Sequence, residues 1–422
     1  DPYAAKLEAL IAESQPPGTD GWHHVTDALA ALEALEADAL AAAKQDGEDI
    51  PPHSYPDYFS IFDRPIGPAA VPSLARRVVA AMPGSDFEQS VTALAASPRI
   101  IWPVSEHPEP APNAGVIGRS LPTLGTMRDI ARPLHARAVT AAAKDDWPAA
   151  IAANERALAV ARATSNLIVV AQLSAATIRH QALDDIDAWT SARRLSPDHL
   201  AALAEALDRQ WHLPTLEAVY TANAIVMQQV FATTDDADAT PAERREAEQF
   251  AAASHIYEQE LVRLASLPAT DRNINLDKLD KLNPLVSPER PHNDYLKGVF
   301  VKVIAALDLI AVRGNLTRTA LAIKLHRART GSLPATLADL THPNAPTFTR
   351  DPITGDDPLI YRIDESNPRG FILYSIGTDL IDNNGTPTEN PRDANAPGDP
   401  VWPAFATRPP PEPDADASGD IE

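Results

Sequence analysis

Alanine and leucine recur at three- and four-residue spacing through most of the first 290 residues. In the stretch 25–44, VTDALAALEALEADALAAAK, acidic residues separate the apolar ones, which is typical of a helix buried on one face. The pattern predicts an all-helical domain over residues 1–290. The expected helices cover residues 3–14, 25–44, 72–82, 86–96, 121–144, 147–164, 166–193, 197–209, 214–232 and 241–267.

The region 121–164 resembles one tetratricopeptide-type hairpin of two helices. Its sequence LHARAVTAAAKDDWPAAIAANERALAVARAT places small alanines where two helices would approach and an acidic turn between them. No second copy follows at a 34-residue period. A helical bundle and a short helical-repeat array therefore both stay open for the 1–290 domain.

Residues 291–405 are expected to form a second unit that opens with one long helix. About 35 residues read as helix, or roughly 50 Å, with a weak point at Gly314. Gly331 suits the left-handed conformation that ends a helix, and Pro334 forbids continuation. Arg327 and Arg329 complement the negative end of the helix dipole.

Two short apolar runs follow the long helix. The runs 359–363 and 371–376 are separated by a turn rich in Asn, Pro and Gly, which predicts an antiparallel hairpin. The fold class expected for the whole chain is thus mainly α with a small α+β module at its end. We expect residues 47–72 to be an ordered aromatic loop, and residues 406–422, rich in proline and acid, to be a disordered tail.

The charge of the chain and its lack of cysteine exclude several classes of partner and chemistry. The formal charge is −22, and only −4 of it belongs to the last seventeen residues, so the body of the protein is acidic. A distributed negative field repels nucleic acid, so no nucleic-acid partner is expected. The absence of cysteine excludes disulfides, thiolate metal sites and a cysteine nucleophile.

The end of the chain resembles a known family. ALAIKLHRARTGSLPATLADL, DPITGDDPLIYRI and GFILYSIGTDLIDNNG follow one another as in the carboxy-terminal half of the type II secretion pseudopilins. The likeness covers about 90 residues, from Leu316 to Phe405. The preceding helical part resembles, more loosely, large uncharacterised bacterial proteins of the planctomycete type that carry the same module. Pseudopilins begin with an apolar anchoring helix, whereas this module follows a large helical domain.

The pseudopilin resemblance implies a calcium site in the last loop. The family's ligand positions correspond to Asp379 and to Asp399, which precedes Trp402, while Asp382 and Asn384 supply further oxygens nearby. Calcium takes six to eight oxygen ligands at flexible geometry, which such a loop can provide. The alternative is a metal-free turn, because Asp, Asn and Gly also tolerate left-handed backbone angles.

No sequence motif indicates catalysis. The chain contains no GxSxG, GxxxxGK[ST], GxGxxG after a strand, or HExxH. His180 and Asp184 share a helix face, as do His255 and Glu258, and an ordinary side-chain pair explains both. An enzyme would require these groups to meet in one deep pocket.

These observations predict a non-catalytic scaffold or a protein- or peptide-binding module of the cell envelope or periplasm. One alternative is an envelope hydrolase built from dispersed carboxylates and histidines, and another is a component of a type II secretion-like apparatus. No run in the chain approaches the roughly 20 apolar residues that cross a bilayer. A signal peptide or membrane anchor upstream of Asp1 stays open, since the sequence begins without methionine.

Overall fold

The computed structural model describes residues 2–48, 73–103, 116–165, 168–192, 195–232, 258–272, 292–355, 357–391 and 396–404, with residues 240, 241, 245, 252, 255 and 393 between them. This part of the chain is mainly helical and carries one two-stranded antiparallel sheet, so the expected fold class is confirmed at that level. The elements are α1 (Pro2–Glu13), α2 (His23–Gln45), α3 (Ser73–Ala81), α4 (Asp86–Ala96), α5 (Val116–Ala143), α6 (Trp147–Thr164), α7 (Val169–Ala192), α8 (Pro197–Gln210), α9 (Leu216–Ala232), α12 (His292–Thr330), α13 (Ala345–Phe348), β1 (Ile360–Ile363) and β2 (Phe371–Tyr374).

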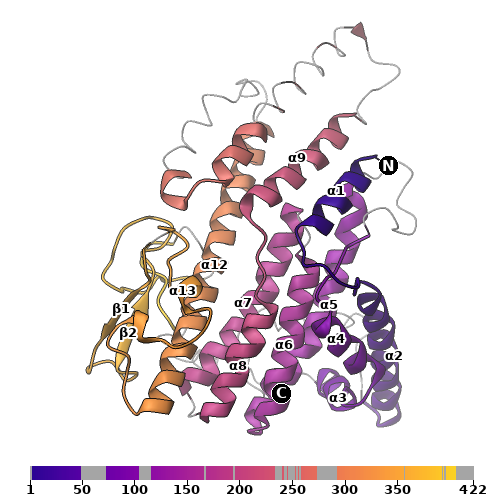
Figure 1. The fold of residues 1–422 in the computed structure, drawn as a ribbon. Helices are drawn as coiled ribbons and strands as arrows, with labels where there is room; N and C mark the ends of the chain where they lie inside the picture. Colours follow the sequence, from indigo (N-terminus) through magenta and orange to yellow (C-terminus); the bar gives the residue numbers. More distant parts are fainter. Residues whose placement is uncertain are drawn as a thin grey trace, which may run out of the picture.

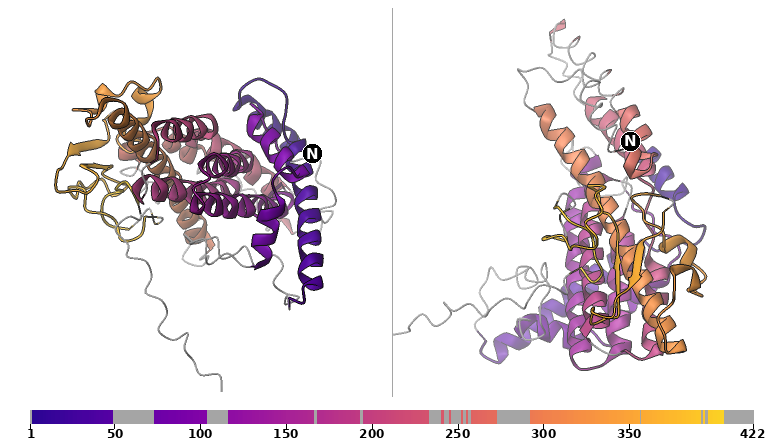
Figure 2. Two further views of the ribbon diagram at one scale, coloured as in Figure 1. Left: turned by 90° about the horizontal axis from the view of Figure 1, so that it is seen from below. Right: turned by 90° about the vertical axis from the view of Figure 1, so that its left-hand side faces the viewer.

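Helices α5, α6, α7 and α8 lie side by side and form the centre of the molecule (Figure 1). Helix α6 is buried on several faces, and many of its buried residues are alanines, whose short side chains let neighbouring helices approach closely. Helices α2, α3 and α4 flank this bundle on one side. The two strands lie on the opposite side, beyond α12 (Figures 1 and 2).

Local signals fix several helix ends. Helix α8 begins as expected, because Ser196 Oγ accepts a hydrogen bond from the His199 amide at 3.2 Å and Pro197 occupies the first position. Helix α12 also ends as expected. Gly331 has φ +81°, and its amide donates to the Arg327 carbonyl at 2.9 Å.

The long helix α12 is shared by two hydrophobic cores. Leu321 and Leu325 belong to the core of the helical bundle, whereas Ala320 and Ile323 belong to the core of the C-terminal module. A helix that is buried on two sides has apolar residues around most of its circumference. The C-terminal module therefore packs onto the bundle through α12.

The antiparallel hairpin forms as expected, but its strands are shorter. Ile360 pairs with Tyr374 and Ile363 with Phe371, so the predicted strands 359–363 and 371–376 were too long by one and two residues. The sheet ends there because the next amide, that of Ser375, donates instead to the Pro400 carbonyl at 3.1 Å. The segment around residue 401 thus lies beside the end of β2 and is hydrogen-bonded to it.

Several expectations concern parts of the chain that lie outside the described residues. Most of the expected ordered loop 47–72, the expected domain boundary near residue 290 and the expected tail 406–422 are among them. Among the residues that are described, no helix combines the length and apolarity needed to span a membrane.

Gly314, the expected weak point, lies inside a continuous helix. A Cβ atom at this position would lie 1.8 Å from Cζ2 of Trp211, so the glycine gives room for the indole ring. We expect Gly314→Ala to lower the free energy of unfolding by up to about 2 kcal/mol, because overpacking costs about 1–3 kcal/mol and the gain in helix propensity offsets only about 1 kcal/mol. Urea unfolding at neutral pH measures this change.

Gly125 is the matched control, since it lies in α5 and a Cβ there meets nothing within 4 Å. Gly125→Ala is expected to raise stability by up to about 1 kcal/mol. If both variants gain stability, Trp211 does not restrict position 314.

Candidate functional site

A buried ionic cluster joins α7 to α12. Arg313 of α12 is 3% exposed, and its guanidinium contacts three side chains of α7. It donates to Asp184 Oδ1 at 2.6 Å, lies 2.7 Å from His180 Nδ1, and lies 3.6 Å from Asp187 Oδ2. These three α7 residues share one helix face because they follow one another at spacings of four and three.

Asp187 also ties the C-terminal segment to this cluster. Its Oδ1 atom accepts hydrogen bonds from Thr317 Oγ1 at 3.0 Å and from Trp402 Nε1 at 2.7 Å. Burial raises the pKa of Asp187 to about 6, against the opposing effect of Arg313. The cavity beside it measures only about 10 Å³, which is room for about one water molecule. The cluster therefore fastens three segments together and leaves no space for a substrate.

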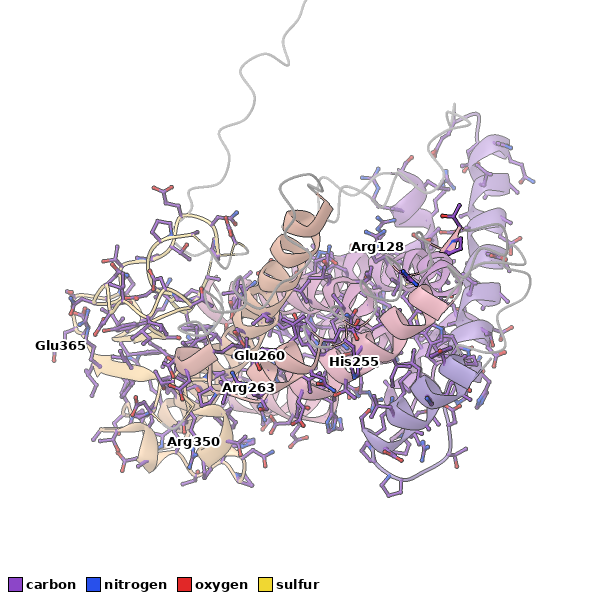
Figure 3. The ribbon with its side chains drawn as sticks, turned by 90° about the horizontal axis from the view of Figure 1, so that it is seen from above. Arg128, His255, Glu260, Arg263, Arg350 and Glu365 are labelled. Carbon is purple, nitrogen blue, oxygen red and sulfur yellow. The ribbon has the colours of Figure 1, made fainter. Side chains whose placement is uncertain are left out.

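The two histidine pairs identified in the sequence do not meet in a common pocket. His180 and Asp184 are both bonded to Arg313 inside the cluster. His255 is exposed, and its ring lies 2.9 Å from Gln259 Nε2. In Figure 3, His255 lies away from the C-terminal hairpin, which is marked by Glu365. The convergence required by the hydrolase alternative is thus not found between these residues.

Glu258, the expected partner of His255, is buried instead. Its side chain is 7% exposed, and one carboxylate oxygen has no hydrogen-bond partner among the described residues. Burial raises the pKa of Glu258 to about 7. Neither Glu258 nor His255 lines the small cavity beside Asp187 or either of the two larger cavities near the C-terminal end of α12.

The loop expected to bind calcium is held by hydrogen bonds to its own backbone. The fully buried Asp399 accepts from the amides of Asn383 at 3.2 Å and Gly385 at 2.7 Å, one to each carboxylate oxygen. Asp382 Oδ1 accepts from the Asn384 amide at 2.8 Å, and Asp379 Oδ1 accepts from the Ile381 amide at 3.1 Å.

These hydrogen bonds engage the three aspartates that were expected to bind calcium, and Asn384 lies in the same turn. Asp379, Asp382 and Asn384 are exposed, and Asn384 has φ +57°, as a tight turn requires. Within the described ranges, no group of three or more His, Asp or Glu side chains is placed to hold a metal ion. Calcium stays a prediction of the resemblance.

Asp399 gives this loop a direct test. We expect Asp399→Asn to lower the free energy of unfolding by about 1–3 kcal/mol, because an amide offers one acceptor oxygen to two buried backbone donors. Asp382→Asn at an exposed position is the control, with an expected change within about 0.5 kcal/mol. Thermal unfolding should be measured with calcium and with a chelator. A calcium-dependent rise in the midpoint that Asp399→Asn removes would support the calcium hypothesis instead.

The largest of the three cavities lies where α7 and α12 end and α8 begins, against the hairpin turn. It is an open groove of about 670 Å³, within the usual range of ligand sites. We call it the basic groove, because the described residues of its lining include three cationic side chains and no carboxylate. It is lined by Thr190, Ser191, Leu195, Leu200, Lys324, Arg327, Ala328, Gly331, Leu333, Pro368, Arg369 and Phe371.

The cations of the basic groove are held close together. Lys324 Nζ lies 5.4 Å and Arg369 Cζ lies 5.9 Å from the centroid of the Trp402 ring, which itself stacks on Phe371. Arg327 donates to the Arg369 carbonyl at 3.2 Å. Burial lowers the pKa of Lys324, and repulsion from Arg369 and Arg327 lowers it further. Positive charge is thus concentrated here, and the carboxylate that acts on Arg369, that of Asp187, is not among the described residues of the wall.

A smaller cavity of about 300 Å³ is lined by other residues of the last turns of α12. His326 and Arg329 line it together with His342, and Glu205 of α8 supplies a carboxylate. His342 Nε2 also lies 3.4 Å from Asp208 Oδ2. This cavity has mixed charge, so the concentration of positive charge is a property of the basic groove.

The basic groove was not predicted from the sequence. Arg327 was expected only to complement the helix dipole, and no local pattern connects Lys324 with Arg369, which lies in the turn between the strands. One signal was present: residues 309–338 contain five lysines and arginines and no acidic residue, although the chain is strongly acidic. Periodicity conceals this run because its cations occupy exposed, half-buried and buried positions.

Comparison of the chain with protein-family models, with curated proteins and with solved structures gave no match.

Proposed function

We propose that this chain is a non-catalytic module that binds a protein or peptide partner in the basic groove. The supporting observation is the groove itself, an open cavity of about 670 Å³ between the bundle and the hairpin turn, with cationic, apolar and hydroxyl-bearing walls. Binding sites for ligands favour such concave junctions between structural units. The cluster around Arg313 supports the proposal indirectly, because it fixes the two sides of the groove to each other.

A location at the cell envelope and kinship with the pseudopilins belong to the same proposal. They are supported by the resemblance of residues 316–405 and by the order of long helix, glycine stop and antiparallel hairpin, which the fold shares with that expectation. The role as a secretion component depends on the resemblance alone.

Binding in the basic groove can be measured with a single fluorescent label. The chain has no cysteine, so Ala328→Cys places a unique thiol at the rim, where Ala328 is exposed. We expect at least one pool of mixed-sequence dodecapeptides to change the emission of an environment-sensitive dye at this position. Ala37→Cys on α2 is the control, because it is exposed on the opposite side of the molecule (Figure 1). If no pool changes the emission at position 328 more than at position 37, the proposal is wrong.

A further inference from the structure

We infer that the basic groove accepts an acidic, extended peptide segment of a partner protein. This inference depends on the proposed function and adds the chemistry of the ligand. Its basis is the juxtaposition of Lys324 and Arg369 at the Trp402 ring, with Arg327 bonded to the Arg369 carbonyl, in a groove with no carboxylate among the described residues of its lining.

The cations of the groove repel one another, because Arg369 and Arg327 both lower the pKa of Lys324. Arg369 reaches the groove from the turn between the strands, whereas Lys324 and Arg327 come from α12, so the fold brings like charges from distant segments together. Burial lowers the pKa of Arg369 against the opposing attraction of Asp187, and burial also lowers the pKa of Lys324. A ligand carboxylate between these side chains would offset their mutual repulsion and form charge-assisted hydrogen bonds.

The other walls favour a peptide over a compact anion. Leu195, Leu333 and Phe371 give the groove apolar surface beside the cations. Ser191 contributes a hydroxyl that is buried without a hydrogen-bond partner among the described residues. In an extended peptide, alternate side chains point to the same side, about 7 Å apart. A peptide with acidic residues at alternate positions can therefore present carboxylates to the cations and its small side chains to the apolar wall.

The rest of the molecule opposes binding of acidic ligands elsewhere. The chain has a formal charge of −22, so an acidic peptide is repelled from most of the surface. The groove cations are partly shielded from water, so they attract a carboxylate strongly at short range. Selective binding of an acidic peptide by an acidic protein would thus identify the groove as its site.

Three fluorescein-labelled dodecapeptides test the inference on the full chain by fluorescence anisotropy. They repeat Asp-Ala, Asn-Ala or Lys-Ala six times. We expect the Asp-Ala peptide to bind at least about tenfold more tightly than the Asn-Ala peptide, because charge-assisted hydrogen bonds are the stronger ones. The double variant Lys324→Glu/Arg369→Glu is expected to lose binding of the Asp-Ala peptide and to gain binding of the Lys-Ala peptide.

Arg327→Glu provides a second variant that does not disturb the Trp402 packing, because Arg327 is exposed. It should weaken binding of the Asp-Ala peptide about tenfold while circular dichroism shows an unchanged fold. Equal affinity for the Asp-Ala and Asn-Ala peptides would overturn the inference and leave the proposed binding function standing. Unchanged affinity in folded Arg327→Glu, or displacement of the Asp-Ala peptide by tripolyphosphate at lower concentrations than by unlabelled Asp-Ala peptide, would also overturn it.

Discussion

Replacing Arg313 by methionine is expected to lower the free energy of unfolding by about 3–5 kcal/mol at pH 7.5. The guanidinium is 3% exposed and is the cation that faces both Asp184 and Asp187. Methionine keeps an apolar stem but leaves two buried carboxylates without their counter-charge. Removing one partner of a buried ionic group costs more than the pair contributes, because the remaining charge stays desolvated.

The loss in Arg313→Met should shrink as the pH falls. Burial already raises the pKa of Asp187 to about 6, and Arg313 is the main opposing influence. A raised carboxyl pKa costs folding stability above the folded-state value, and the cost disappears below the unfolded value of about 4. Without Arg313 this pKa rises further, so the folded variant holds its proton at pH 5 and avoids the unpaired charge.

Urea unfolding at pH 7.5 and pH 5 measures both effects. Arg329→Met is the matched control, because Arg329 is exposed on the same helix. It should change stability by less than about 0.5 kcal/mol. A loss below about 1 kcal/mol for Arg313→Met at pH 7.5, or a larger loss at pH 5, would contradict the role given to this cluster.

Replacing Trp402 by alanine is expected to cost a further large amount, about 3–5 kcal/mol. The indole is 3% exposed, stacks on Phe371 with ring centroids 5.7 Å apart, and donates to Asp187. Its removal leaves a cavity in the core of the C-terminal module and deprives Asp187 of a donor. Hydrogen exchange should show reduced protection of the β2 amides beyond the change in the bundle, because Trp402 joins these two parts.

Trp402→Phe separates packing from hydrogen bonding. It retains an aromatic ring against Phe371 but loses the bond to Asp187, so we expect a smaller loss of about 1.5–3 kcal/mol. Ile381→Ala is the control, since Ile381 is an apolar residue of the same module with 58% exposure. It should stay within about 0.5 kcal/mol. Equal losses for Trp402→Phe and Trp402→Ala would assign nearly all of the effect to the hydrogen bond.

The predictions made from the sequence succeeded where structure depends on neighbouring residues. The Ser196 cap, the glycine stop at Gly331 and the antiparallel hairpin depend on residues within a few positions of one another. The strand ends were wrong because the partner of the Ser375 amide is Pro400, which lies far along the chain.

The candidate site was predictable only in part. The sequence identified His180 and Asp184 as sharing a helix face, and the structure places both beside Arg313, 129 residues beyond Asp184. Nothing local to α7 reveals that cation. Similarly, Gly314 is unfavourable within a helix considered alone, and only the position of Trp211 explains why a side chain is absent there.

By itself the sequence determined that this protein is mainly helical, that a long helix stops at Gly331 and that a short hairpin follows, because periodicity, caps and turns act over a few residues. The tertiary structure decided which buried charges meet and where positive charge collects. Lys324 and Arg369 share the Trp402 ring because α12 and the hairpin turn pack together, and no local rule of helix or strand formation specifies that contact.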